Sequence, residues 1–146
     1  MKRALLLCAL LAPLSLCAMV NKKVNHQLSG VWQQVQISPT DKHVMHLPVW
    51  KVLQNDGTFF IFLITDKSGQ SIIAHEGHYN VTSDSTVVEH VTGSVINSAF
   101  VGLSNNITYS FVGKDKINIT YQLPGAANST TESWVRVKLE YPHLKK

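Results

Sequence analysis

Apolar and polar residues alternate along most of the chain downstream of residue 28. This period of two is typical of strands that bury one face and expose the other. No stretch there shows the repeat of about 3.6 residues that an amphipathic helix requires. Clusters of Asn, Asp, Gly and Ser separate the alternating runs, as expected for turns. The pattern predicts eight strands, at about residues 30–37, 47–54, 58–65, 71–81, 86–92, 106–112, 116–123 and 132–140.

The hairpin between the sixth and seventh strands has a predictable register. Pairing Phe111 with Ile117 places the apolar residues of both strands on one face. The same register sets Tyr109 opposite Ile119 and leaves a three-residue loop at 113–115. A two-residue loop would turn the apolar face of one strand outward, because a slip of one residue exchanges the two faces.

Short turns between successive strands predict an antiparallel meander, in which neighbours in sequence are neighbours in space. Eight such strands leave exposed edges unless the first and last strands pair. The predicted fold is therefore all-β, an antiparallel eight-stranded up-and-down barrel with an interior that is filled or holds one small ligand. A two-sheet sandwich is the alternative.

The strand at 58–65 departs from the alternation, because its residues are apolar on both faces. An outward apolar face is usually covered. We expect a terminus, a loop or a second subunit to cover it, which makes this strand a candidate homodimer surface.

The first 17 residues are typical of a secretory signal peptide, with a basic start, an apolar run too short to span a bilayer and small residues before a cut after Cys17. Alternatives are a lipoprotein signal that leaves a lipid anchor on Cys17, and a retained helix. The predicted organisation is a signal at 1–17, a linker at 18–27 and one barrel domain at 28–146. The protein is expected to be exported, and to be periplasmic, anchored to the outer membrane or secreted, with no transmembrane span.

Charge and cysteine content exclude several classes of function. The chain has 13 Lys and Arg residues against 9 Asp and Glu residues, and loss of Lys2 and Arg3 with the signal lowers the basic count to 11. This near balance, without a basic cluster, argues against nucleic acid as a partner. Cys8 and Cys17 both lie in the signal, so the mature domain has no thiol for a disulfide, a metal site or a nucleophile.

The Gly30-Val31-Trp32 stretch resembles the Gly-x-Trp signature of the lipocalin and fatty-acid-binding superfamily. Arg136 on the last predicted strand stands where that superfamily has a basic residue near the Trp. The resemblance implies a structural role for Gly30, Trp32 and Arg136, with Trp32 closing one end of the barrel beneath the guanidinium group.

A closer resemblance covers about residues 28–140. It is carried by the stretches 53–59, 79–90 and 134–137. These are similar to a lipocalin-like (calycin-type) family of short exported proteins from gut-type Gram-negative bacteria, whose members form a domain of unknown function. The resemblance implies a fold and export, and it supplies no substrate and no catalytic residue.

Histidines are numerous, seven in all, and two pairs are spaced by three residues. Residues three apart on a strand point to opposite faces, so His75 and His78 cannot hold one metal ion unless a bulge at Gly77 rotates the chain. A turn at 83–84 would set His90 opposite Gly77. Three alternatives remain open for the histidines: a metal or haem site, a polar lining of a ligand cavity, and ordinary structural histidines. No metal or other cofactor is predicted.

The same register would place Glu89 on the outer face with Glu76, where an acid–base pair is less expected than ordinary surface charge. No Gly-x-Ser-x-Gly elbow or glycine-rich phosphate loop is present in the sequence. The sequence therefore predicts no enzymatic activity and no catalytic residue.

Two long connections, 38–46 and 93–105, border the predicted mouth of the barrel, and long loops in compact domains are often functional. The candidate lid residues on these loops are His43, Met45, His46 and Phe100. The candidate pocket residues are Tyr79, His90, Tyr109, Phe111, Ile119 and Tyr121. We expect a binder of a small apolar or amphipathic molecule; the alternative is a filled barrel that serves as a cell-envelope or secreted protein-interaction module, such as an inhibitor or accessory protein.

Overall fold

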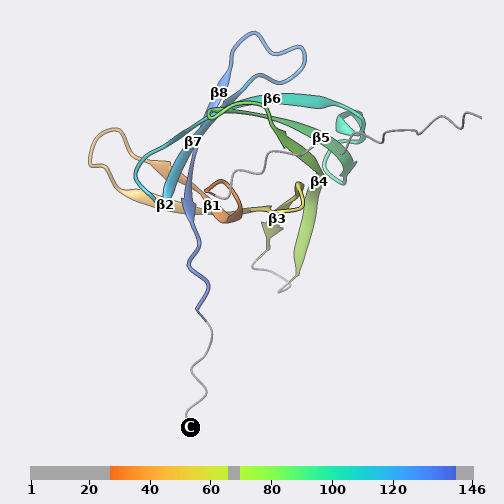
Figure 1. Cartoon of the computed structure of the whole chain (residues 1–146). Coiled ribbons are helices and arrows are strands. Elements are labelled where there is room, and N and C mark those ends of the chain that lie inside the picture. The colour runs from red at the N-terminus through yellow and green to blue at the C-terminus, as the bar shows by residue number, and fades with distance from the viewer. Residues whose placement is uncertain (1–26, 66–69, 141–146) are drawn as a thin grey trace, which may run out of the picture.

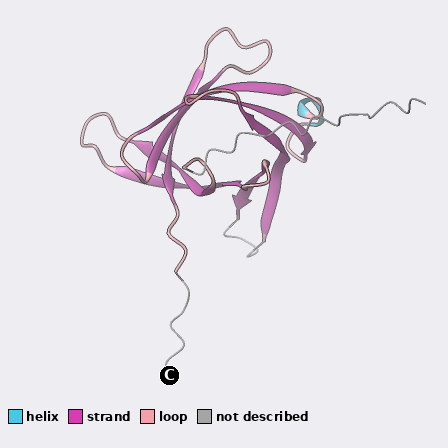
Figure 2. Cartoon of the chain, viewed as in Figure 1, coloured by secondary structure: helices cyan, strands magenta, loops and turns pink. Residues whose placement is uncertain are grey.

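The structure is a computed structural model that describes residues 27–65 and 70–140. Its eight strands form a closed ring, and strands dominate the described chain (Figures 1 and 2). The strands are β1 (Gly30–Ile37), β2 (Val44–Leu53), β3 (Thr58–Ile64), β4 (Ser71–Val81), β5 (Thr86–Ser94), β6 (Ser104–Phe111), β7 (Lys116–Tyr121) and β8 (Thr130–Arg136). A short helical turn, η1 (Ser98–Phe100), packs beside β5. The predicted all-β class and eight strands are confirmed.

Each strand pairs antiparallel with the next, and β8 pairs with β1 to close the barrel. Every described strand therefore has a neighbour on both sides, which removes the exposed edges of an open sheet. The predicted register of the β6–β7 hairpin is also confirmed, since Phe111 lies opposite Ile117 and Tyr109 lies opposite Ile119. The up-and-down barrel is consistent with the lipocalin-like fold that the Gly-x-Trp stretch implies.

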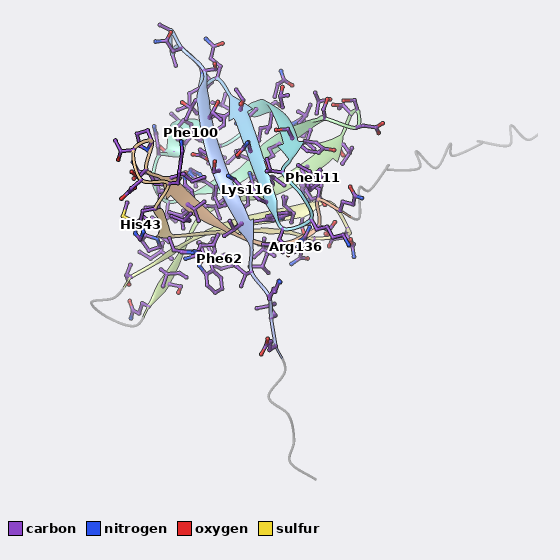
Figure 3. The ribbon with its side chains drawn as sticks, turned by 90° about the vertical axis from the view of Figure 1, so that its left-hand side faces the viewer. His43, Phe62, Phe100, Phe111, Lys116 and Arg136 are labelled. Atoms are coloured by element: carbon purple, nitrogen blue, oxygen red, sulfur yellow. The ribbon has the colours of Figure 1, made fainter. Side chains whose placement is uncertain are left out.

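This topology gives the barrel two distinct ends. The connections after β2, β4 and β6, together with residues 27–29, lie at one end, which we call the closed end. The connections after β1, β5 and β7 lie at the other, which we call the open end. In Figure 3, Phe111 and Arg136 lie toward the closed end, and His43 and Phe100 lie toward the open end.

A plug of side chains fills the closed end. Trp32 is fully buried, and its indole Nε1 donates a hydrogen bond to the Leu28 carbonyl at 2.8 Å. The Arg136 guanidinium carbon lies 4.1 Å from the centroid of the Trp32 ring, a cation–π contact that contributes about 0.5–2 kcal/mol. Arg136 also donates through Nη1 to the Ser29 carbonyl at 2.9 Å.

Gly30 is required at this plug for two reasons. Its φ of 141° lies in a region that side chains disfavour, and an added Cβ would stand 2.5 Å from Arg136 Nη1. Any other residue at this position would strain the backbone and force the guanidinium group to shift.

β2 begins earlier than predicted, at Val44, so Met45 and His46 belong to this strand and pair with β1. The register shifts between Gln33 and Val35, where residues 47–49 of β2 bulge opposite β1. Pro48, which has no N–H to donate, lies in this bulge, and it is tolerated there because the bulge leaves its position unpaired. The predicted loop at 38–46 therefore shortens to 38–43.

The outer face of β3 carries Phe60 and Phe62, whose ring centroids lie 6.2 Å apart. Both are half-buried, and they lie opposite Val52 and Trp50 of β2. The neighbouring strands thus give this apolar face part of its cover.

Several predicted segments fall outside the described residues. The predicted signal at 1–17 and the linker up to residue 26 lie there, as do residues 141–146 of the predicted domain. No helix in the described part of the chain is long and apolar enough to cross a membrane.

Candidate functional site: a cavity at the open end

The barrel encloses a cavity of about 250 Å³ in its open half. Strands and open-end loops both contribute apolar side chains to it. The apolar lining consists of Val49, Phe59, Ile61, Leu63, Ala74, Val91, Ile96, Phe100, Leu103, Ile107, Ile119, Leu123, Pro124 and Trp134. The polar lining consists of Gln34, Lys51, His75, Glu89, Ser104, Asn105, Tyr121 and Glu132. An apolar pocket with a few polar groups is the usual form of a small-molecule site.

Two buried charges face each other in this cavity. Lys51 of β2 and Glu89 of β5 form an ion pair at 2.5 Å, with side chains 8% and 7% exposed. The Lys51 ammonium nitrogen also lies 5.5 Å from the centroid of the Phe59 ring. Each charge is tolerated inside the barrel because the other compensates it, since an isolated buried ion loses several kcal/mol of hydration.

The register of the β4–β5 hairpin explains why Glu89 points inward. The amides of Thr82 and Ser83 both donate to the Thr86 carbonyl, so the loop is one residue longer than the predicted turn at 83–84. Tyr79 consequently lies opposite Glu89, and His78 lies opposite His90. The prediction that Glu89 occupies the outer face is wrong, because a slip of one residue exchanges the two faces of a strand.

A second irregularity follows at Gly77, where the β4–β5 register shifts again. An added Cβ at Gly77 would stand 2.0 Å from the His90 carbonyl oxygen, so only glycine fits there. His90 lies opposite His78 instead of Gly77, is exposed, and does not line the cavity. Its Nδ1 lies 2.7 Å from the Ser104 hydroxyl.

His75 reaches the cavity through a bulge in β4. The β3–β4 register skips Ala74, so Ala74 and His75 both line the cavity. The His75 ring centroid lies 5.6 Å from that of Phe100, and its buried Nδ1 has no hydrogen-bond partner in the described part of the protein. Burial lowers the pKa of His75, and the Lys51 charge lowers it further while Glu89 opposes the shift. The imidazole is therefore neutral at pH 7.

Glu132 of β8 holds two aromatic donors on the wall of the cavity. Its Oε1 accepts a hydrogen bond from the Tyr121 hydroxyl at 2.9 Å, and its Oε2 accepts one from the Trp134 indole at 3.1 Å. Burial raises the pKa of Tyr121, and the Glu132 charge adds to the effect, so the phenol stays protonated and donates. The carboxylate is thus held in a fixed orientation.

Of the six candidate pocket residues, Ile119 and Tyr121 line the cavity. Tyr79 and Tyr109 are 2% exposed and belong to the core toward the closed end. The Tyr79 hydroxyl donates to the Gln54 carbonyl at 2.7 Å, which ties it to the β2–β3 turn.

Phe111 also lies at the closed end, with its ring centroid 6.5 Å from that of Trp32. These aromatic residues are inward, as their alternation indicates, but they lie at depths where side chains already fill the barrel. A strand pattern specifies the face of a residue and not its height along the barrel.

Of the four candidate lid residues, one lines the cavity and three do not. Phe100 lies on η1 and lines the cavity (Figure 3). His43, Met45 and His46 are exposed and do not line it. β2 extends through Met45 and His46, so these residues form part of a strand and not a lid. The Nδ1 atom of His46 lies 3.0 Å from the side-chain oxygen of Gln33.

The sequence did not lead us to the charged residues of the site, although its pattern around Lys51 indicates a buried charge. Lys51 occupies an inward position of β2 between Val49 and Leu53, which line the cavity or the core. A lysine in an apolar series of period two indicates a buried charge. In the described residues, no group of three His, Cys, Asp or Glu side chains is arranged to hold a metal ion.

A search of curated proteins gives no match to this chain. A model of the family described as "Domain of unknown function (DUF4488)" matches residues 27–143, a range that contains all eight strands and every residue that lines the cavity. The chain therefore belongs to the DUF4488 family.

Proposed function

We propose that this protein is exported and binds a small amphipathic molecule, without catalysis, in the cavity at the open end of its barrel. The observation that carries the proposal is the cavity itself, about 250 Å³ in volume and lined by apolar side chains with a few polar ones. This volume lies just below the range of about 300–1,000 Å³ usual for ligand pockets, so the ligand is expected to be small.

The polar lining also supports binding. Buried charges such as Lys51 and Glu89 often contribute less to stability than apolar residues of the same size would. Both groups line the cavity, which fits a role in recognition. The open-end side chains of Phe100, Leu103 and Leu123 would form the entrance.

Isothermal titration calorimetry with hexan-1-ol, hexylammonium and hexanoate, applied to the purified domain, would test the proposal. At least one probe is expected to bind, and Leu103→Trp is expected to block the entrance and abolish binding. Val112→Trp is the matched control, because Val112 is half-exposed at the closed end and does not line the cavity. No binding by any probe, together with no small molecule in native mass spectra of protein from its own host, would contradict the proposal.

Export has a separate test. Intact-mass and N-terminal analysis of the protein recovered from its host should give a chain that starts at residue 18, or one that starts at a lipidated Cys17. Recovery of a chain that starts at Met1 contradicts both forms of the prediction.

A protein-interaction role is the second candidate, and the outer face of β3 and β4 favours it. Ile73 is 42% exposed and lies opposite the half-buried Phe62. If this face is a homodimer surface, sedimentation analysis should find a dimer in the wild type and a monomer in Phe62→Lys. A wild type that stays monomeric at high concentration contradicts the homodimer.

A further inference from the structure

The charges that line the cavity do not balance. Among the described residues of the lining, those that can carry a charge near neutral pH are Lys51, His75, Glu89 and Glu132. Lys51 and Glu89 neutralise each other through their ion pair. His75 is neutral, because burial and the Lys51 charge disfavour its protonation. One negative charge, that of Glu132, is left over.

Glu132 has no cationic partner among the described residues. Within residues 27–65 and 70–140, ion pairs shorter than 4.0 Å join Lys51 to Glu89, and Arg136 and Lys138 to Asp115, and none includes Glu132. Its two hydrogen bonds come from the neutral donors Tyr121 and Trp134. These orient the carboxylate and stabilise it, but they leave its charge in place, and a carboxylate can accept about four hydrogen bonds.

We propose that the ligand is a small amine, with a cationic ammonium group that pairs with Glu132 and an apolar body that fills the rest of the cavity. This inference rests on the proposed function and names its ligand class. A partly buried carboxylate favours a cation strongly, because the low local dielectric strengthens the attraction and the hydrogen bonds are charge-assisted. The apolar wall beside it, which includes Ile119 and Leu123, suits a short hydrocarbon chain.

The same set of charges disfavours an anionic ligand. Lys51 is the one lysine or arginine among the described residues that line the cavity, and Glu89 already occupies it at 2.5 Å. An incoming carboxylate would have to displace Glu89 from Lys51 and would add a second negative charge to the space that Glu132 faces. Like charges at short range in such an environment repel strongly.

The test compares head groups on one hydrocarbon chain. In the wild type, calorimetry should show that hexylammonium binds about tenfold more tightly than hexan-1-ol, and that hexanoate binds least. This comparison needs no variant, so it holds even if a substitution disturbs folding. Equal or tighter binding of hexan-1-ol or hexanoate would overturn the inference.

Glu132→Gln assigns the preference to one residue. Glutamine keeps an oxygen that can accept from Tyr121 or Trp134 but removes the charge. The variant should lose about tenfold in affinity for hexylammonium while its affinity for hexan-1-ol changes less than about twofold. An unchanged amine preference in a folded variant contradicts the role of Glu132.

The two proposals fail in different ways. If hexan-1-ol binds, Leu103→Trp blocks it, and hexylammonium shows no advantage, the amine inference is wrong while the cavity remains a binding site. If no probe binds at all and native mass spectra of protein from its own host show no small molecule, the proposed function fails, and the inference that rests on it fails as well.

Discussion

At the closed end of the barrel, aromatic and aliphatic side chains meet across the axis and leave almost no space, whereas at the open end charged and polar side chains face a cavity of about 250 Å³. Both ends are built from the same eight strands and the same alternation of inward and outward residues. The difference lies in which inward residues are charged and in how large they are.

We assign stability to the packed closed end and, under the proposed function, recognition to the open end. Close packing around Trp32 and Tyr79, both 2% exposed or less, is the arrangement that contributes most to folding. The buried Lys51–Glu89 ion pair and the His75 imidazole contribute little or nothing to it, and proteins usually retain such groups where they serve a function. Substitutions at the two ends, and a change of pH, should therefore affect stability to different degrees.

Trp32→Ala should destabilise the protein by about 3–5 kcal/mol, because it removes a fully buried aromatic side chain and leaves a cavity in the plug. Urea denaturation followed by circular dichroism measures the change. Trp50→Ala is the matched control, because Trp50 is half-buried on the outer face of β2 and should lose less. A loss at Trp32 equal to or below that at Trp50 would show that the closed end is not the main source of stability.

Lys51→Met should lower the free energy of unfolding by about 3 kcal/mol, since it leaves the Glu89 carboxylate buried without its cation. The expected loss of stability lies at the low end of the usual range for breaking a buried ion pair, because the neighbouring cavity lets water reach the Glu89 carboxylate. The double variant Lys51→Met, Glu89→Leu should recover most of the loss. A double variant that remains as unstable as the single one would mean that the pair itself stabilises the barrel.

A smaller effect is expected from pH. The pKa of His75 is lower in the folded protein than its ordinary value of about 6.5, so the unfolded chain binds protons more readily as the pH falls below that value. The free energy of unfolding should therefore decrease as the pH falls below about 6.5. Denaturation at a series of pH values should show a shallower decrease in His75→Gln, and an identical slope in the two proteins would contradict a buried neutral imidazole.

Most of the fold could be predicted from the amino-acid sequence. Alternation located all eight strands, and the requirement that Phe111 and Ile117 share a face fixed the β6–β7 register correctly. The same reasoning failed for β4–β5, where Thr82 and Ser83 both bond to Thr86 and lengthen the loop by one residue. Turn residues there fit either loop length, and both faces of β5 contain polar residues, so the hydrophobic pattern did not penalise the wrong register.

The order of apolar and polar residues favoured a closed barrel over a two-sheet sandwich, and the resemblance to the lipocalin superfamily assigned Gly30, Trp32 and Arg136 to one end of it. That Lys51 meets Glu89, and that Glu132 faces the cavity with no cation from the described residues, became evident only in three dimensions. Strand period fixes the face of a residue through local geometry. Its partners across the barrel and its height along the axis depend on bulges, loop lengths and strand closure, which join residues far apart in the chain.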